Sequence, residues 1–320
     1  MPPPRSRCAP FTAADRVRRR ASRRGAKFAT GATVVALLAS CVGPPPPADT
    51  PAPPVAAAPR LPPAVTPRAG FLLAGSTTQG GLIIGTAPPG TARLTLDGAE
   101  VPIAADGAFV IGFDRDASAN AMLTATLASG AVEAMALAIA ARNWDISRLN
   151  SLPKYPLPAP EFARVRPGEL AQINAARALA SDAQGWRQRF AWPLTGRIST
   201  LFGSQRIYAN GEAGGYHSGI DIAQPTGTPV LAPADGVVIL AAAAPFTLEG
   251  NLLMLDHGMG LNSAFLHLSR IDVRVGDHVR RGQMIGAVGM TGRATGPHLH
   301  WSLKWRDRKL DPLLVAGPMP

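Results

Sequence analysis

The sequence has 320 residues, of which 46% are hydrophobic, 17% charged and 6% aromatic, with 33 glycines and 32 prolines. This composition excludes a coiled coil and a wholly disordered chain, and the length allows about two domains. The formal net charge is +11, but residues 1–40 carry nine basic side chains against one acid and so account for eight of these charges. The rest of the chain is nearly balanced, and we therefore expect no nucleic-acid partner.

Residues 1–40 have the pattern of a signal peptide. An arginine-rich stretch, Arg16 to Lys27, leads into an apolar segment over 28–40 that is too short to span a membrane as a helix of a folded protein. Leu38-Ala39-Ser40-Cys41 is similar to a bacterial lipobox, in which the cysteine carries the lipid. We expect a periplasmic protein that is attached to the membrane, in particular the outer membrane, through a lipid on Cys41.

The next two segments differ sharply in composition. Residues 41–68 are dense in proline and lack hydrophobic periodicity, which predicts an extended tether. Residues 69–142 alternate short apolar runs, such as Leu82–Ile84 and Phe109–Phe113, with turn signals such as Asp97-Gly98. This spacing predicts a small immunoglobulin-like β-sandwich that acts as a spacer or binds an envelope protein.

A linker and a helix are expected over 143–190, before a C-terminal domain over 191–320. The stretch Glu161 to Arg189 is rich in Ala, Leu, Gln and Arg, which predicts the helix. All six histidines follow this helix. Four side chains that could bind a metal lie in two short segments, 217–221 and 298–300. His217 and Asp221 would share one face of an extended chain, and His298 and His300 one face of another strand.

Four such groups on two neighbouring strands could converge on a metal. Imidazole nitrogen and carboxylate oxygen suit Zn²⁺, and a catalytic zinc site keeps three protein ligands and a water molecule. Structural zinc sites usually close with cysteine, and this region has none. The pattern therefore favours a hydrolytic zinc site, although spacing alone does not say whether His298 or His300 is the ligand.

Several motifs then occur in a fixed order. They are His-x-x-x-Asp at 217–221, GTPVLAPADGVV at 227–238, HLS at 267–269, VGDHVRRGQMIGAVGMTG at 275–292 and TGPHLH at 295–300. The segment from Gly215 to Pro312 resembles the lysostaphin-type (LytM-like) zinc endopeptidases, which hydrolyse peptidoglycan. The resemblance implies a mainly β protein whose C-terminal peptidase domain has two antiparallel sheets.

The resemblance also implies the roles of the site residues. One zinc ion would be bound by His217, Asp221 and His300, with His298 as the general base and His267 holding the water and stabilising the oxyanion. The substrate would be a peptide cross-link of peptidoglycan, either a D-alanyl to meso-diaminopimelate bond or a glycine bridge. Trp301 and Ser302, and residues 262–265, depart from the common family pattern, and we expect them to touch the substrate groove.

Two other functions remain as alternatives. The segments at 230–238 and 273–289 also resemble biotinyl and lipoyl carrier domains, but a carrier needs a lysine to modify, and none lies between Lys154 and Lys304. The second alternative is a catalytically inactive relative that binds the cell wall or activates an amidase. His257 is expected to fill a turn and His278 to be solvated, while Arg206 and Arg293 could contact a substrate carboxylate.

Overall fold

The computed structural model describes residues 70–149 and 160–320, which belong to one compact unit. The predicted signal peptide over 1–40 and the tether over 41–68 lie outside the described residues, as does the middle of the linker. Within the described residues, no helix is both long and apolar enough to cross a membrane.

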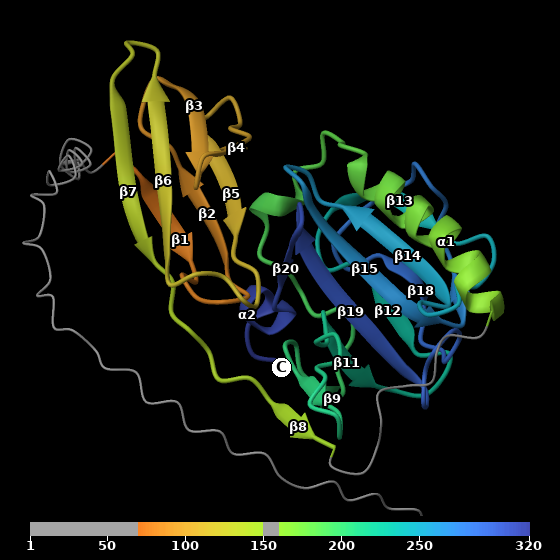
Figure 1. Ribbon diagram of the computed structural model, residues 1–320. Helices are drawn as coiled ribbons and strands as arrows, with labels where there is room; N and C mark the ends of the chain where they lie inside the picture. Colours follow the sequence, from red (N-terminus) through yellow and green to blue (C-terminus); the bar gives the residue numbers. More distant parts are fainter. Residues whose placement is uncertain (1–69, 150–159) are drawn as a thin grey trace, which may run out of the picture. The chain divides into compact units, whose positions relative to one another are not determined.

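The first described region is built from two antiparallel sheets. One sheet has the order β1-β2-β5 and the other β4-β3-β6-β7 (Figure 1). The strands are β1 (Leu72–Gly75), β2 (Leu82–Thr86), β3 (Thr91–Leu96), β4 (Ala99–Val101), β5 (Ala108–Gly112), β6 (Asn120–Leu127) and β7 (Val132–Ala138). Ile83 and Phe109 from the first sheet and Leu94 and Leu123 from the second are buried in a common core. This region is thus stabilised by apolar burial between its sheets.

The C-terminal region also has two antiparallel sheets, as expected. Its large sheet has the order β17-β13-β14-β15-β19-β11-β9, with β20 paired to β19, and its small sheet has the order β12-β18-β16. The strands are β9 (Arg197–Thr200), β11 (Ile220–Ala223), β12 (Pro229–Leu231), β13 (Gly236–Ala241), β14 (Asn251–Asp256), β15 (Leu261–Leu268), β16 (Arg270–Ile271), β17 (His278–Val279), β18 (Met284–Ala287), β19 (His298–Trp305) and β20 (Arg308–Leu310). Two further short strands, β8 (Ile146–Arg148) and β10 (Gln205–Ile207), pair in parallel.

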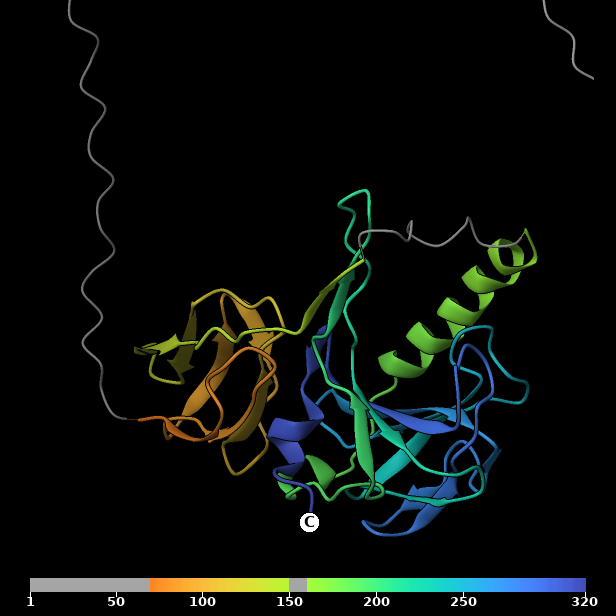
Figure 2. The same ribbon diagram turned by 90° about the horizontal axis from the view of Figure 1, so that it is seen from below.

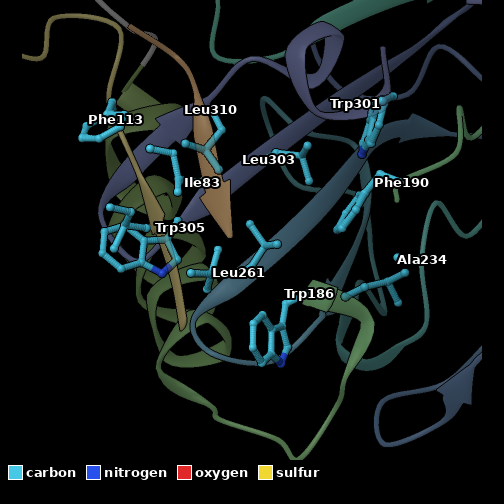
Figure 3. Packing of buried hydrophobic residues seen from close by; sticks show 14 of the residues in the cluster. Ile83, Phe113, Trp186, Phe190, Ala234, Leu261, Trp301, Leu303, Trp305 and Leu310 are labelled. Carbon is cyan, nitrogen blue, oxygen red and sulfur yellow. The ribbon is translucent and has the colours of Figure 1, made fainter. Parts of the chain in front are cut away.

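The two faces of the large sheet have different roles. Every second residue of β19, beginning at Leu299, is buried in the main core, and Trp301 and Leu303 pack there with Phe190 and Leu261 (Figure 3). The intervening residues, including His298 and His300, belong to the opposite face because side chains alternate along a strand. A second apolar cluster covers part of that face and includes Met254 and Ala264.

The prediction of a helix over 161–189 is wrong at the C-terminal end. Helix α1 (Pro160–Ala178) stops eleven residues earlier, and only a short 3-10 turn, η1 (Gly185–Arg187), follows. The chain leaves the helix because its next polar groups bond to the end of β14: the backbone N–H and hydroxyl of Ser181 donate to Asp256 at 2.9 and 2.6 Å. Helix α1 lies beside β13 and β14 (Figure 1) and is seen along its length in Figure 2. A last short helix, α2 (Pro312–Ala316), is capped by Asp311.

Candidate metal centre

The pairing of β11 with β19 brings Asp221 opposite His300. Asp221 Oδ1 lies 2.9 Å from His300 Nδ1 and 3.0 Å from His217 Nε2. The potential ligand atoms of these three residues all lie within 4.8 Å of one another, and among the described residues they are the group suited to a metal ion. The structure therefore brings His217, Asp221 and His300 together, and this group of potential ligands includes His300 and not His298.

The ring nitrogens of His217 are arranged as those of a metal ligand. Its Nδ1 lies 3.2 Å from the carbonyl oxygen of Leu201, which can only accept a hydrogen bond. In a neutral ring that donates from Nδ1, Nε2 carries a lone pair, and a cation can then take the place of the proton that otherwise joins Nε2 to the Asp221 carboxylate. The Leu201 carbonyl thus favours the tautomer that a metal ligand needs. The donor chemistry of this site therefore fits a divalent metal such as zinc.

Burial and hydrogen bonding oppose each other at Asp221. Burial alone would raise the pKa of its carboxyl group, but the hydrogen bonds with His217 and His300 outweigh it and hold that pKa well below its usual range. Burial lowers the pKa of His300, which is 7% exposed. A charged carboxylate and a neutral imidazole are the forms that bind a metal.

A glycine permits the close approach of these strands. A Cβ atom at Gly219 would lie 2.4 Å from the carbonyl oxygen of Trp301 and 2.7 Å from His300 Nε2. Both distances are far below van der Waals contact, so a larger residue at this position would push β11 and its ligand Asp221 away from His300.

Two further histidines lie beside the three potential ligands. The ring centroids of His267 and His298 are 4.8 Å apart, and that of His267 is 6.3 Å from that of His300. His267 Nδ1 donates to the carbonyl of Thr291 at 2.8 Å, and His298 Nδ1 to that of Gly296 at 2.8 Å. When each ring is neutral, its one proton is on Nδ1 and Nε2 carries a lone pair. Each Nε2 can therefore accept a proton. Burial lowers the pKa of His267 to about 4, which favours its neutral form.

His267 reaches this face through a β-bulge. Asn251 pairs with Leu268 and Leu253 with Phe265, so β15 has one more residue than β14 between these two pairs. His267 itself has a left-handed backbone with φ of 64°. The extra residue reverses the alternation, because Phe265 and Leu268 both point into the main core while His267 lies beside His298. Nothing in the sequence marks this bulge.

The remaining histidines are structural or exposed, as expected. His257 is fully buried, with Nδ1 2.7 Å from the Asp235 carbonyl and Nε2 2.7 Å from Ser263 Oγ. His278 is exposed. The side chain of Arg206 is exposed, and the backbone N–H of Arg293 donates to the carbonyl of Leu248 at 2.9 Å.

The expectation that the departures from the family pattern touch the groove is wrong for part of them. Trp301 is fully buried in the main core, where its ring meets Trp192 edge to face at a centroid distance of 5.7 Å. Ser263 and Phe265 also point to the core, because they share the parity of Leu261 on β15. Ser302, by contrast, has the parity of His300 and belongs to the face of the metal centre.

Residues of the sandwich region contact the segment around His217, which the sequence did not indicate. The hydroxyl of Tyr216 donates to Asp114 at 2.7 Å. The buried Arg115 donates to the carbonyl of Gly203 at 3.0 Å, and the N–H of Gly203 donates to the carbonyl of His217 at 2.9 Å. Asp114 and Arg115 therefore support the backbone on both sides of a potential metal ligand.

Comparisons with known proteins agree with this geometry. Residues 215–312 match the model of peptidase family M23. The chain is 40% identical over 132 residues to the peptidoglycan DD-endopeptidase ShyA of Vibrio cholerae. This alignment covers 41% of this chain and 30% of ShyA. It is 41% identical over 124 residues to the DD-carboxypeptidase/endopeptidase Mpg of Neisseria meningitidis, which covers 39% of this chain and 28% of Mpg. The match thus spans less than a third of either relative.

A solved structure extends the likeness beyond the matched domain. This structure, from Pseudomonas aeruginosa and assigned to the M23 peptidases, aligns with 76% of this chain and 96% of its own chain, with a TM-score of 0.58 and 29% identity. The aligned part is larger than residues 215–312 alone. The similarity to this structure therefore includes residues outside the matched domain.

Proposed function

Because residues 215–312 form a peptidase family M23 domain, we propose that this chain is a zinc metalloendopeptidase that hydrolyses peptide cross-links of bacterial peptidoglycan. The observation that carries the proposal is the convergence of His217, Asp221 and His300, with His267 and His298 beside them on one face of the sheet. The names of the relatives ShyA and Mpg support a peptidoglycan substrate. A peptidase of this kind acts at the cell envelope.

In this proposal His217, Asp221 and His300 hold the zinc ion. When bound, zinc supplies a Lewis acid that lowers the pKa of water toward about 7 and polarises a carbonyl group. With two neutral imidazoles and one carboxylate as ligands, the zinc site would have a net charge of +1. The hydrogen bonds of Asp221 with His217 and His300 hold its pKa low, so this ligand is a charged carboxylate at neutral pH.

His298 and His267 act on the water and the substrate. His298 Nε2 lies 3.7 Å from Asp221 Oδ1, so its lone pair is next to the metal centre and accepts a proton from the attacking water. The neutral His267 orients that water by accepting a hydrogen bond at Nε2. Stabilising an oxyanion, the other role expected of His267, needs a proton on Nε2, which burial of this ring disfavours.

We propose that the bond cut is the D-alanyl to meso-diaminopimelate cross-link. A glycine bridge is the alternative substrate. Sacculi digested with the purified full chain should release soluble fragments, and an Asp221→Ala variant should release none. Wild-type protein that contains zinc but releases no fragments from sacculi of either cross-link type would favour the inactive, amidase-activating alternative.

We further propose that the chain is periplasmic and anchored by a lipid on Cys41, with residues 41–68 as a tether. Lipid chains contribute roughly 0.8 kcal/mol per buried methylene, and two chains hold a protein at a membrane. The variant Cys41→Ala should therefore move the protein from the membrane fraction to the soluble fraction. Equal solubility of wild type and variant would contradict the anchor. The sandwich region, in the same proposal, is a spacer or a docking module for an envelope protein.

A further inference from the structure

Helix α1 shares one face of the large sheet with the metal centre. Ile173 and Ala176 of the helix are buried in the cluster that contains Met254 and Ala264. Ala264 on β15 pairs with Ser302 on β19, two residues from His300 on the same face. The helix therefore packs on the same face as the site, although 36 residues separate its end from the start of the matched domain.

The loop at 246–250 connects the helix to the β-bulge at His267. The backbone N–H of His267 donates to the carbonyl of Glu249 at 2.8 Å. This bond satisfies the amide that the bulge removes from the regular ladder. The adjoining Gly250 has φ of 65°, and a Cβ atom there would lie 2.4 Å from the backbone of Thr291, whose carbonyl accepts the proton of His267 Nδ1. The loop and Thr291 together thus hold both the backbone and the ring of His267.

Two side chains of helix α1 bind this loop. Arg166 donates to both carboxylate oxygens of Glu249, with Nη1 and Nη2 at 2.7 and 2.8 Å. Glu169 accepts from the backbone N–H of Thr247 at 2.6 Å and from its hydroxyl at 2.7 Å. Arg166 also donates to Glu169 at 3.0 Å, so the three charged groups form one network.

The burial of this network sets it apart from an ordinary surface ion pair. The side chains of Arg166 and Glu249 are both 15% exposed, whereas those of the nearby pair Arg164 and Glu161 on the same helix are 71% and 68% exposed. Exposed pairs contribute little, but breaking a largely buried pair leaves a charge without its partner. Nothing in the fold of α1 itself requires Arg166 to reach a loop 83 residues away.

We propose that Arg166 is a positioning residue for His267: through Glu249 it fixes the 246–250 loop, and through that loop the β-bulge that places His267 at the metal centre. Glu169 supports the same loop through Thr247. The working peptidase unit then begins at helix α1, near residue 160, and not at residue 191. The catalytic part of this inference rests on the proposed peptidase function, whereas the structural coupling does not.

The test uses the full chain with Arg166→Gln, Arg166→Lys and, as a matched control on the same helix, Arg164→Gln. Hydrogen exchange followed by mass spectrometry reads the peptides that contain residues 247–251 and 266–268. Loss of Arg166 should speed exchange there by about tenfold or more, because a hydrogen-bonded charge pair is lost, while peptides from β11 stay unchanged. Arg164→Gln should change none of these peptides.

Kinetics provide the second readout. With a cross-linked peptide dimer as substrate, Arg166→Gln should lower kcat by about tenfold to 100-fold at a KM within about twofold, because His267 is displaced and the bound metal is not. Zinc content should remain that of the wild type. Arg166→Lys, which keeps the charge but not the two-pronged contact, should recover part of both effects.

Each outcome decides a different claim. If exchange at residues 266–268 is the same in Arg166→Gln as in Arg164→Gln, the proposed coupling is wrong, whatever the activity. If exchange rises but wild type itself cleaves no cross-link, the coupling stands and the peptidase function fails. Should Arg166→Gln not fold, Arg166→Lys, which keeps the charge but not the two-pronged contact with Glu249, is compared with Arg164→Gln on the same peptides, and equal exchange in these two variants would overturn the coupling.

Discussion

Asp221 and His300 are hydrogen-bonded at 2.9 Å although 79 residues separate them in the chain. They meet because they are direct partners in the antiparallel pairing of β11 with β19. A two-residue period places Asp221 and His300 on the same face, away from the core that Ile222 and Leu299 fill. Two of the three potential ligands are therefore placed by two paired strands, whose relative position is fixed by the ladder, while His217 lies in the segment just before β11.

Removing a potential ligand should separate metal binding from catalysis. We expect Asp221→Ala and His300→Ala to weaken zinc affinity by at least about 100-fold and to abolish activity, because two remaining protein ligands hold the ion poorly. His298→Ala should retain zinc and lose turnover. Zinc content after dialysis and titration calorimetry measure the difference. Similar metal loss in all three variants would mean that the base and a ligand have been confused.

The tight contact at Gly250 gives a prediction on the 246–250 loop. In Gly250→Ala the new Cβ would collide with the backbone of Thr291, in addition to the cost of a left-handed alanine. We expect the free energy of unfolding to fall by about 2 to 4 kcal/mol and activity to be lost. Gly130→Ala is the control, because Gly130 has φ of 83° but no atom within 4 Å of the added Cβ. It should cost about 1 kcal/mol and leave activity intact. Urea unfolding of both variants checks the contrast, and equal losses would mean that the contact with Thr291 has no role.

The buried His257 predicts a loss of stability in acid. Burial lowers the pKa of His257 to about 4 in the folded protein, whereas an unfolded histidine titrates near 6.5. As pH falls from about 6.5 to 4, the unfolded state binds a proton that the folded state refuses, so stability should fall by up to about 1.4 kcal/mol per pH unit. Above this window the contribution is fully present.

Urea unfolding at several pH values measures this slope. His257→Gln should unfold with a shallower pH dependence between pH 4 and 6.5 than wild type, and His278→Gln, at an exposed histidine, should not differ from wild type. The other titrating groups contribute to all three proteins alike. A wild-type slope that His257→Gln leaves unchanged would assign the acid sensitivity to another group.

Much of the site could be predicted from local patterns. Alternation along β19 places His298 and His300 on one face, as expected, and the order of the motifs predicted the match of residues 215–312 to the model of peptidase family M23. His217 precedes β11, so the extended chain expected over 217–221 forms a strand only from Ile220. These features depend only on residues that are near in sequence or on recurring motifs. The three-residue set His217, Asp221 and His300 followed from the resemblance and agrees with the distances found.

The features that could not be predicted depend on contacts between distant residues. The position of His267 requires a bulge with φ of 64°, and no residue type marks it. The end of α1 is set by the bonds of Ser181 with Asp256, 75 residues away, which outweigh the helix propensity of the residues after 178. The expectation for Trp301 is wrong for a local reason: it follows His300 directly on β19, so alternation points it into the core.

The central claim is tested most directly by the products formed from one defined substrate. A purified peptidoglycan dimer, in which two peptide stems are joined by a D-alanyl to meso-diaminopimelate bond, is incubated with zinc-loaded wild type or His298→Ala and analysed by mass spectrometry. We predict that wild type converts the dimer into two monomers with the addition of one water molecule, and that the zinc-containing His298→Ala variant leaves it intact. An intact dimer with wild-type protein that carries its zinc, or equal cleavage by both proteins, would contradict the account.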